Sequence, residues 1–350
     1  MPRILIISNM YPSEEKPYAG IFVKNQYEYL KTIPDLKIDL VYMQRTFTGM
    51  FGSILKYFAF YFRFLPKIFN TYDVIHVHAF AAHFFLAYQY KIFHRKTKII
   101  VTFHGSDYKN FIGNNIVSKI YRAMSEKIDC VLAVGNQELN YIKEYIHPKD
   151  SKVLCAGVDA TKFYLIKDTV KEYDFLFIGS FYNHKGVDIF IDAIKLLDDK
   201  DLRICFVGSG EYLDDIKDLQ KTYNISIFLN IDHDKLVDLY NKAKFLVMSS
   251  RLDAFGLVVT ESMYSGTPVI IAPTGGLLDQ VINNFNGYIL KENTPEALGN
   301  EMKKASMISN EEYKLLSQNA LNSNKQFSLQ NVCKELETLY KSIAMDSKLN

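Results

Sequence analysis

Short apolar runs alternate with helix-period segments along the whole chain. The run ILIIS at residues 4–8 is typical of a strand, and the segment GIFVKNQYEYLKT that follows it has the spacing of a helix. Because the runs are almost wholly apolar rather than alternating, we expect parallel sheets that are covered on both faces. Further strands are expected at residues 38–43, 73–78, 98–105, 129–135, 151–157, 173–180, 203–210, 225–230, 243–250, 268–273 and 286–290.

The alternation pauses once, at residues 159–172, where charged residues accumulate. A chain of 350 residues exceeds one ordinary α/β core. We therefore expect two Rossmann-like, doubly wound domains in tandem, at 1–165 and 171–325, with a helix at about 328–346 packing back on the first. Ligands of such sheets bind beyond the carboxyl ends of the strands, so the cleft between the domains is the expected site.

Charge is distributed unevenly between the two halves. Residues 1–170 contain 22 Lys and Arg against 14 Asp and Glu, whereas the remainder contains 19 against 25. The net charge of +2 predicts no nucleic-acid partner, but the basic first half favours contact with an anionic surface or substrate. Four cysteines without metal-like or redox-like spacing predict buried free thiols and a reducing compartment. They are Cys130, Cys155, Cys205 and Cys333.

The first apolar run is too short for a signal peptide, and no uncharged apolar run is long enough to span a membrane, so we expect a cytoplasmic protein. Residues 47–69 are rich in aromatics and contain no acid. On a helical wheel Lys56, Arg63 and Lys67 fall within about 40° of one another, and Pro66 should interrupt the helix near its end. The segment is either a buried helix with an exposed basic stripe or an interfacial helix on anionic lipid. Eight Lys and Arg against two acids at 84–127 favour peripheral membrane association.

The stretch SRLDAFGLVVTES, residues 250–262, places Asp253 in an expected loop and Glu261 about two turns into an expected helix. The free N–H groups and dipole of that helix start favour a phosphate. Asp253 and Glu261 could then accept hydrogen bonds from a sugar and a ribose, or they could be a helix cap and a solvated residue. The helix is expected to begin with Phe255, Gly256, Leu257 and Val258.

Other strand ends carry candidate chemistry. Lys185, in FIGSFYNHKG, is either a surface lysine or a phosphate clamp, and Gly208 and Gly210, in CFVGSGEY, mark a tight turn or close approach to a ligand. In HVH, neither His76 nor His78 is expected to be catalytic. The DHD at 232–234 is similar to a metal-binding pattern, but helix capping is the favoured interpretation.

Taken in order, these motifs resemble the GT-B-fold, retaining glycosyltransferases of family 4. The resemblance covers roughly residues 4–300, in the same order throughout, and each motif is weak alone. It is carried by YPSEEKPYAGIFVKNQ, DVIHVH, VTFHGSD, AGVDATKF, FIGSFYNHKGVDIFIDA, CFVGSGEY and the long segment MSSRLDAFGLVVTESMYSGTPVIIAPTGGLLDQVINNFNGYIL.

The resemblance implies a role for several residues. Glu261 matches the carboxylate that binds the nucleotide ribose, and Asp253 matches the one near the donor sugar, where Glu is usual. Lys185 matches the basic residue on the donor diphosphate, and His104 matches the histidine near the donor sugar and the reacting centre. Gly20 matches the N-terminal loop near the diphosphate and the acceptor.

The chain also departs from the family pattern. Ser180 stands where the family often has a second phosphate-binding arginine, and Ala19 stands where a paired glycine is usual. Gly275 and Gly276 match the glycine pair of a donor-side loop. Family members of this kind need no metal, so no metal or other cofactor is expected.

The expected function is transfer of a sugar, with retention, from a UDP- or GDP-linked donor to a saccharide acceptor. The basic aromatic first half favours a polyprenyl-linked acceptor in bacterial surface polysaccharide synthesis, at the inner face of the membrane. Alternatives are a nucleotide-sugar epimerase or polyglucan synthase of the same architecture, or a non-catalytic partner subunit, which Asp253 and Ser180 would favour.

Overall fold

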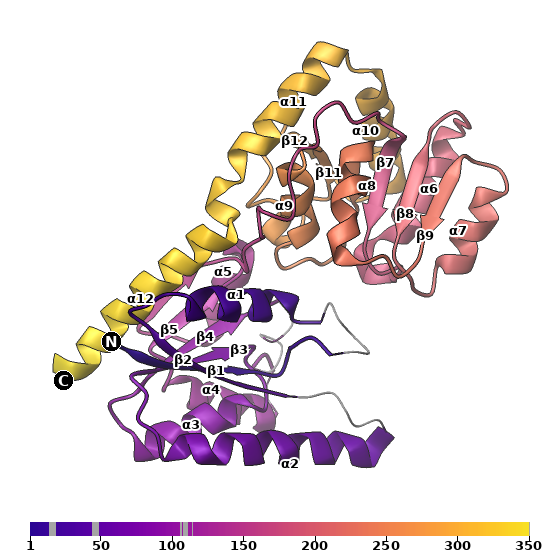
Figure 1. Cartoon of the computed structure of the whole chain (residues 1–350). Helices are drawn as coiled ribbons and strands as arrows, with labels where there is room; N and C mark the ends of the chain where they lie inside the picture. The colour runs from indigo at the N-terminus through magenta and orange to yellow at the C-terminus, as the bar shows by residue number, and fades with distance from the viewer. Residues whose placement is uncertain (14–18, 44–48, 106, 108–110, 114, 350) are drawn as a thin grey trace. The chain divides into compact units, whose positions relative to one another are not determined.

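The computed structural model (Figure 1) describes residues 1–13, 19–43, 49–105, 107, 111–113 and 115–349. The chain forms two compact units. Unit 1 comprises residues 1–157 and 329–350, and unit 2 comprises residues 158–328. Each unit is built on a six-stranded parallel sheet covered by helices on both faces, as the apolar runs predict.

The sheet of unit 1 has the strand order β2-β1-β3-β4-β5-β6. Its strands are β1 (Arg3–Ser8), β2 (Lys37–Tyr42), β3 (Val74–His78), β4 (Lys98–Phe103), β5 (Cys130–Ala133) and β6 (Asp150–Val153). Its helices are α1 (Ile21–Lys31), α2 (Gly49–Ile68), α3 (Phe84–Phe93), α4 (Ile116–Ser125), α5 (Asn136–Tyr145) and α12 (Leu329–Leu349). We expected Pro66 to interrupt this helix, but α2 continues past it to Ile68.

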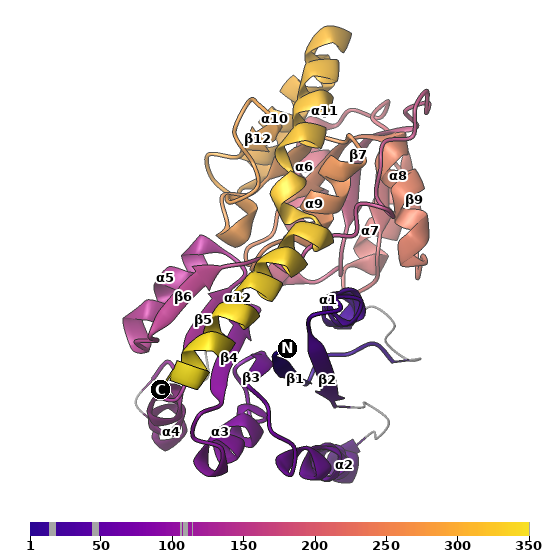
Figure 2. The same cartoon turned by 60° about the vertical axis from the view of Figure 1, so that its left-hand side comes forward.

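Alternate residues of each strand in unit 1 point to opposite faces. Leu5 and Ile7 of β1 pack with α2, α3 and α5 in one apolar cluster, and α1 and α12 pack on the other face. Both views show α2 and α3 on one side of these strands and α12 on the other (Figures 1 and 2). Within the described residues, no helix combines the length and hydropathy needed to cross a bilayer.

A polar contact joins α12 to the middle of this sheet. Nδ1 of His76 on β3 lies 2.6 Å from the hydroxyl of Tyr340, and Nε2 lies 2.7 Å from Oγ1 of Thr102 on β4. Both ring nitrogens are therefore hydrogen-bonded inside the unit. Burial lowers the pKa of His76 to about 3, so the ring is neutral at pH 7. His76 is a structural histidine.

Unit 2 has the strand order β12-β11-β10-β7-β8-β9. Its strands are β7 (Tyr173–Ile178), β8 (Ile204–Val207), β9 (Ile225–Phe228), β10 (Ala243–Met248), β11 (Val269–Ile271) and β12 (Gly287–Ile289). Its α-helices are α6 (Val187–Leu197), α7 (Leu213–Gln220), α8 (Leu236–Lys242), α9 (Leu257–Tyr264), α10 (Pro295–Met307) and α11 (Asn310–Ser323), with 3-10 turns η2 (Asn183–Lys185), η3 (His233–Lys235), η4 (Gly275–Leu277) and η5 (Lys325–Phe327).

The direction of winding reverses once in each sheet. In unit 2 this happens between β7 and β10, and in unit 1 between β1 and β3. The loops that leave the carboxyl ends of these paired strands diverge to opposite sides, which leaves room for a ligand. The residues of interest in each unit follow these strands.

The His76–Tyr340 contact gives a prediction for stability. Replacing Tyr340 by Phe removes a hydroxyl and leaves Nδ1 of His76 buried without a partner, so we expect a loss of about 1–3 kcal/mol in the free energy of unfolding. Urea denaturation measures this loss. Tyr61→Phe, at an exposed position on α2, is the matched control and should be neutral. Equal stability of the two variants would contradict the assignment.

Candidate functional site

The candidate donor site in unit 2 is built around an ion pair at the carboxyl edge of the sheet. Nζ of Lys185, from the turn after β7, lies 2.7 Å from Oδ2 of Asp253, from the loop after β10. The Asp253 side chain is 9% exposed and that of Lys185 is 26% exposed. The hydroxyl of Ser250 is 3.5 Å from the same carboxylate oxygen. The structure thus brings together the two residues that the sequence singled out for phosphate and sugar.

A close backbone approach fixes the position of Lys185. Gly186, the next residue, has a φ of 66°, and a Cβ built on it would lie 1.7 Å from the carbonyl oxygen of Ser249. The Ser249 hydroxyl donates a hydrogen bond of 2.7 Å to the Gly186 carbonyl. Only glycine fits this left-handed, crowded position. The turn after β7 is therefore locked against the end of β10.

A bidentate ion pair ties the same two loops together. Arg251 places its two terminal nitrogens 2.6 Å from the two carboxylate oxygens of Asp188 at the start of α6. It also donates to the Asn183 carbonyl at 2.7 Å. Arg251 therefore links the loop after β10 to the turn after β7 and the start of α6. The patterns in the sequence did not single out Arg251 or Asp188.

Glu261 is enclosed by two side chains that follow β9. Oε1 lies 3.1 Å from Nε2 of His233, and Oε2 accepts a hydrogen bond of 2.9 Å from the Tyr240 hydroxyl. Burial works against the charged imidazole, but the hydrogen bond and negative charge of Glu261 raise the pKa of His233. Glu261 is 4% exposed, so the alternative of a solvated helix residue is wrong.

The three side chains of the DHD segment at 232–234 make contacts other than the expected helix cap. Asp232 stands at the N-cap position of η3, but its side chain makes no capping hydrogen bond there. Asp232 instead pairs with Lys235 at 3.4 Å, and Asp234 pairs with Lys162 at 2.8 Å. The central residue, His233, is the one that reaches Glu261. In the described part of the chain, no three His, Cys, Asp or Glu side chains are arranged to hold a metal ion.

The start of α9 is held by a buried glutamine. Gly256 is the N-cap and has a φ of 77°, while Leu257 and Val258 begin the helix half-buried. Phe255 is buried against Phe327, with 5.3 Å between ring centroids. The side-chain amide of Gln280 donates a hydrogen bond to the Phe255 carbonyl and accepts one from the hydroxyl of Thr260 on α9. The sequence patterns did not single out Gln280.

Two predicted donor-side glycine positions are explained by packing. A Cβ on Gly208 would lie 1.8 Å from the Gly179 carbonyl oxygen, and one on Gly276 would lie 2.2 Å from the Ala254 carbonyl oxygen. Gly275 begins the 3-10 turn η4. Because these glycines have no side chain, neighbouring loops at the strand ends can pack backbone to backbone. For Gly208 this agrees with the interpretation as a structural turn. Their approach to a ligand stays a prediction.

In unit 1, His104 follows β4 and belongs to a row of aromatic side chains. Its Nε2 lies 3.2 Å from Nδ1 of His78, and its ring packs on Phe22 with 4.8 Å between centroids. Burial lowers the pKa of His104 to about 3, so the imidazole is neutral at pH 7. His78 and His76 are both 1% exposed. Of the three histidines, His104 is half-buried and His76 and His78 are buried.

Gly20 caps α1 beside the end of β1. Its φ is 73°, and a Cβ there would lie 2.5 Å from the carbonyl carbon of Met10. The loop after β1 and the start of α1 are therefore packed backbone to backbone. Ala19 precedes it half-buried. Residues 14–18 of the motif lie outside the described residues.

Two buried carboxyl groups hold the backbone around His104. Asp107 accepts hydrogen bonds of 3.0 Å from the amides of His104 and Phe80. Glu138, at the start of α5, accepts one of 3.3 Å from the Val134 amide, and its other oxygen, Oε1, has no hydrogen-bond partner among the described residues. Burial, reinforced by the charge of Asp107, raises the pKa of Glu138 to about 8. The protonated form of Glu138 is therefore favoured at pH 7.

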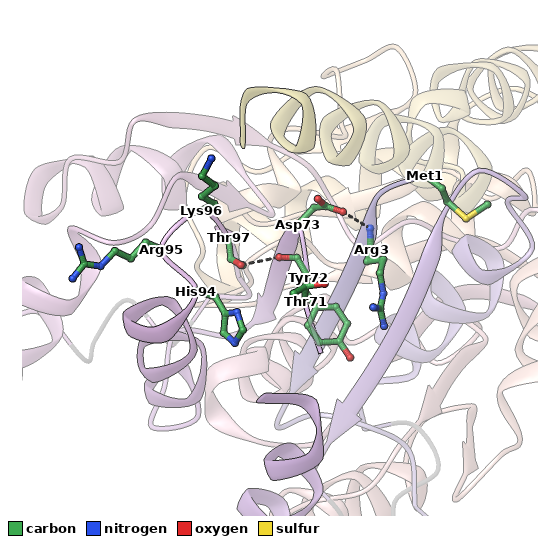
Figure 3. A pocket seen from close by; sticks show the side chains of 9 residues that line it. All are labelled: Met1, Arg3, Thr71, Tyr72, Asp73, His94, Arg95, Lys96 and Thr97. Atoms are coloured by element: carbon green, nitrogen blue, oxygen red, sulfur yellow. Dashed lines mark hydrogen bonds between the residues drawn. The ribbon is translucent and has the colours of Figure 1, made fainter. Parts of the chain in front are cut away.

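A separate hollow of about 550 Å³ lies at the opposite edge of the same sheet (Figure 3). It is lined by residues that precede β1, β3 and β4 or begin β1, among them Arg3, Tyr72 and His94. His104 follows the other end of β4, so this hollow takes no part in the candidate chemistry.

Two family models match most of the chain. The family described as Glycosyl transferases group 1 matches residues 166–323, and Glycosyltransferase Family 4 matches residues 18–162. An uncharacterized glycosyltransferase from Methanocaldococcus jannaschii is 32% identical over 256 residues, which cover 70% of this chain and 68% of that protein. The chain belongs to glycosyltransferase family 4. It is a glycosyltransferase, as its motifs predicted.

Solved structures confirm the GT-B fold of this glycosyltransferase. A sucrose-phosphate synthase from Thermosynechococcus elongatus superposes with a TM-score of 0.78 over 98% of this chain and 99% of the other, at 17% identity. The Anabaena protein HepE, solved with UDP and glucose, superposes with a TM-score of 0.75 over 98% and 100% of the two chains, at 14% identity. GT-B glycosyltransferases use nucleotide-sugar donors.

The contact at Gly186 gives a prediction for the glycosyltransferase. Gly186→Ala forces the turn that carries Lys185 away from Ser249, and we expect a loss of about 3 kcal/mol in unfolding free energy. Gly299→Ala is the matched control, because a Cβ there would lie 3.6 Å from the nearest atom, inside α10. That change should stabilise by up to about 1 kcal/mol. Thermal denaturation of both variants distinguishes the two effects, and similar shifts would contradict the packing argument.

The raised pKa of Glu138 predicts a pH-dependent stability. Between its ordinary pKa of 4.5 and about 8, the unfolded chain loses the proton while the folded chain keeps it, so stability falls with rising pH. The full effect amounts to about 5 kcal/mol at most. Glu138→Gln keeps an acceptor and removes the titration, so the variant should gain stability over the parent as the pH rises from 5 to about 8. Urea denaturation across this pH range tests the point, and parallel curves would contradict it.

Proposed function

We propose that this enzyme transfers a sugar, with retention of configuration, from a UDP- or GDP-linked donor to a saccharide acceptor. The observation that carries the proposal is the meeting of Lys185 and Asp253 where the winding of unit 2 reverses. Glu261 lies eight residues after Asp253, on α9. It is buried there and contacts His233 and Tyr240. A relative of the same fold was solved with UDP and glucose, which supports a nucleoside diphosphate as the leaving group.

The two domains are proposed to divide the substrates. Unit 2, residues 158–328, binds the donor, with Glu261 on the ribose and Lys185 and the start of α9 on the diphosphate. Unit 1 binds the acceptor and contributes Gly20 and His104. No metal is required in this scheme, because the cationic Lys185 and the helix N-terminus stabilise the charge that develops on the departing diphosphate.

The Lys185–Asp253 ion pair has a consequence for catalysis. A donor phosphate that binds Lys185 must share or displace the Asp253 carboxylate, which then becomes free to accept hydrogen bonds from the sugar. His104 is neutral, so it can exchange hydrogen bonds with a sugar hydroxyl without adding positive charge. No enzyme nucleophile is invoked, and the departing phosphate assists removal of the acceptor proton.

We further propose that the acceptor is polyprenyl-linked, that the enzyme works at the inner face of a bacterial membrane, and that the product is surface polysaccharide. Helices α2, α3 and α4 support this proposal through a concentration of exposed apolar side chains. These include Leu55, Tyr57, Phe58, Tyr61, Phe62, Phe85, Ile92, Phe93, Ile116, Val117 and Ile120. An apolar hollow of about 670 Å³ lies between α2 and α3. A concentration of exposed apolar side chains of this kind is typical of an interaction site.

The donor assignment predicts a selective thermal shift. One nucleoside diphosphate among UDP, GDP and ADP should raise the melting temperature of the parent protein, because it binds the folded state. At 100 times its Kd the ligand would add about 2.7 kcal/mol of stability. Lys185→Ala and Glu261→Ala should reduce the shift strongly, whereas Lys195→Ala, an exposed lysine on α6, should leave it intact. A parent protein that responds to none of them would favour a non-catalytic subunit.

A further inference from the structure

Two of the three basic side chains expected along α2 contact other residues of unit 1. Lys67 forms an ion pair of 3.2 Å with Asp39 on β2, and Arg63 lies over the ring of Tyr42 and reaches its carbonyl oxygen at 3.5 Å. The predicted stripe of Lys56, Arg63 and Lys67 is therefore not a uniformly free basic surface. Additional cations for an anionic surface lie in another part of the unit.

A basic hollow on α3 provides such cations. It has a volume of about 460 Å³ and is lined by Tyr88, Lys91, Ile92, Arg95 and Lys127. Tyr88 and Ile92 form apolar walls, and the three remaining residues are cations. Arg95 follows the end of α3, and Lys127 follows α4. Arg95 lines both this hollow and the hollow at the sheet edge, and its side chain extends away from Tyr72 and His94 of the latter (Figure 3).

The charges around this hollow do not balance. Asp129 is 7% exposed and pairs with three lysines, namely Lys91, Lys149 at 3.1 Å and Lys98 at 3.9 Å. Within the described part of the chain, Asp129 is the only carboxylate that pairs with any cation of the group, and Arg95 and Lys127 have no ion-pair partner there. The group therefore keeps a net positive charge.

The pKa of Lys91 is lowered by burial and by the neighbouring positive charges. Burial lowers it first, and the charges of Lys149 and Lys98 lower it further against the opposing effect of Asp129. An anion in the hollow would relieve this repulsion, because it would add a second negative charge to the group. The hollow therefore has the chemistry of a phosphate-binding site.

Helix α3 places the basic hollow next to the apolar one. At 100° per residue, Phe85 and Ile92 lie within about 20° of each other on the exposed ridge of the helix. Leu86 and Gln89 face the apolar hollow on one flank, together with Phe58 and Tyr61 of α2. Tyr88 and Lys91 face the basic hollow on the other flank. A hydrocarbon site and an anion site thus share one helix.

We propose that the basic hollow binds the phosphate headgroup of an anionic phospholipid, while the ridge of α3 and the apolar hollow beside it contact the hydrocarbon. This inference rests on the proposed action at a membrane and names the surface and the lipid class. A free phosphate compound would satisfy the basic hollow alone. The adjoining exposed Phe85 and Ile92 favour a lipid, because a small anion gives them nothing to contact.

Vesicle co-sedimentation of the full-length protein tests the inference. Phosphatidylcholine vesicles are compared with vesicles that also contain phosphatidylglycerol. Arg95→Gln/Lys127→Gln should lower the partition coefficient on the anionic vesicles about 30-fold, which corresponds to about 1 kcal/mol for each basic residue. On phosphatidylcholine vesicles alone, which the parent should bind more weakly, this variant should bind like the parent. Phe85→Ser/Ile92→Ser should lower binding to both kinds of vesicle.

The control removes the same charge from the opposite face of the sheet. Lys31→Gln/Lys334→Gln changes exposed lysines on α1 and α12 and should bind anionic vesicles like the parent. If both double variants lose binding equally, the effect is one of general charge and the inference is overturned. If Arg95→Gln/Lys127→Gln binds like the parent, the basic hollow is not the headgroup site and the membrane proposal survives.

Two further outcomes distinguish the inference from the proposed function. A parent protein that binds neither vesicle overturns both the headgroup site and the membrane location, while the nucleotide thermal shift still tests the transferase. Stabilisation by inorganic phosphate, lost in Arg95→Gln/Lys127→Gln but without vesicle binding, would assign the hollow to a free phosphate compound and overturn the lipid assignment. Circular dichroism of each variant establishes that it is folded.

Discussion

The carbonyl of Ser249 occupies the space in which any residue but glycine at position 186 would place a Cβ. The loops after β7 and β10 therefore meet without an intervening side chain. The contact sets the distance between Lys185 and Asp253, and the Arg251–Asp188 pair spans the same two loops. The donor-side arrangement depends on this backbone contact, because the two charged residues come from loops that are far apart in sequence.

The sheets were predictable because their signal is local. Strands buried on both faces are short apolar runs, and those runs specify two parallel sheets before any tertiary contact is known. Strand ends such as residues 178–186 and 248–256 were also predictable as ligand-binding edges, because a parallel sheet brings its carboxyl ends together. The structure adds which of these loops touch.

The partners of the candidate residues were not predictable from the same patterns. His233 lies in a DHD segment that suggested capping, yet it reaches Glu261, 28 positions later. Glu138 lies on an amphipathic helix like many surface glutamates, and its burial beside Asp107 depends on how α5 docks on the sheet. Lys67 was grouped with Arg63 by helical angle alone, and its pairing with Asp39 depends on the neighbouring strand. Each of these contacts joins elements that the local pattern treats separately.

The hydrogen bond between His76 and Tyr340 links residues 264 positions apart in one unit, whereas unit 2 is a single continuous segment between them. A ribosome releases the chain from its N-terminus, and domains generally fold as units during synthesis. All of unit 2 is therefore translated before α12 is available to cover the second face of the sheet in unit 1. The six strands of unit 1 are synthesised first, but the last helix that packs on them, α12, is synthesised only at the end of the chain. In the interval, the part of the sheet face that α12 later covers stays exposed to solvent.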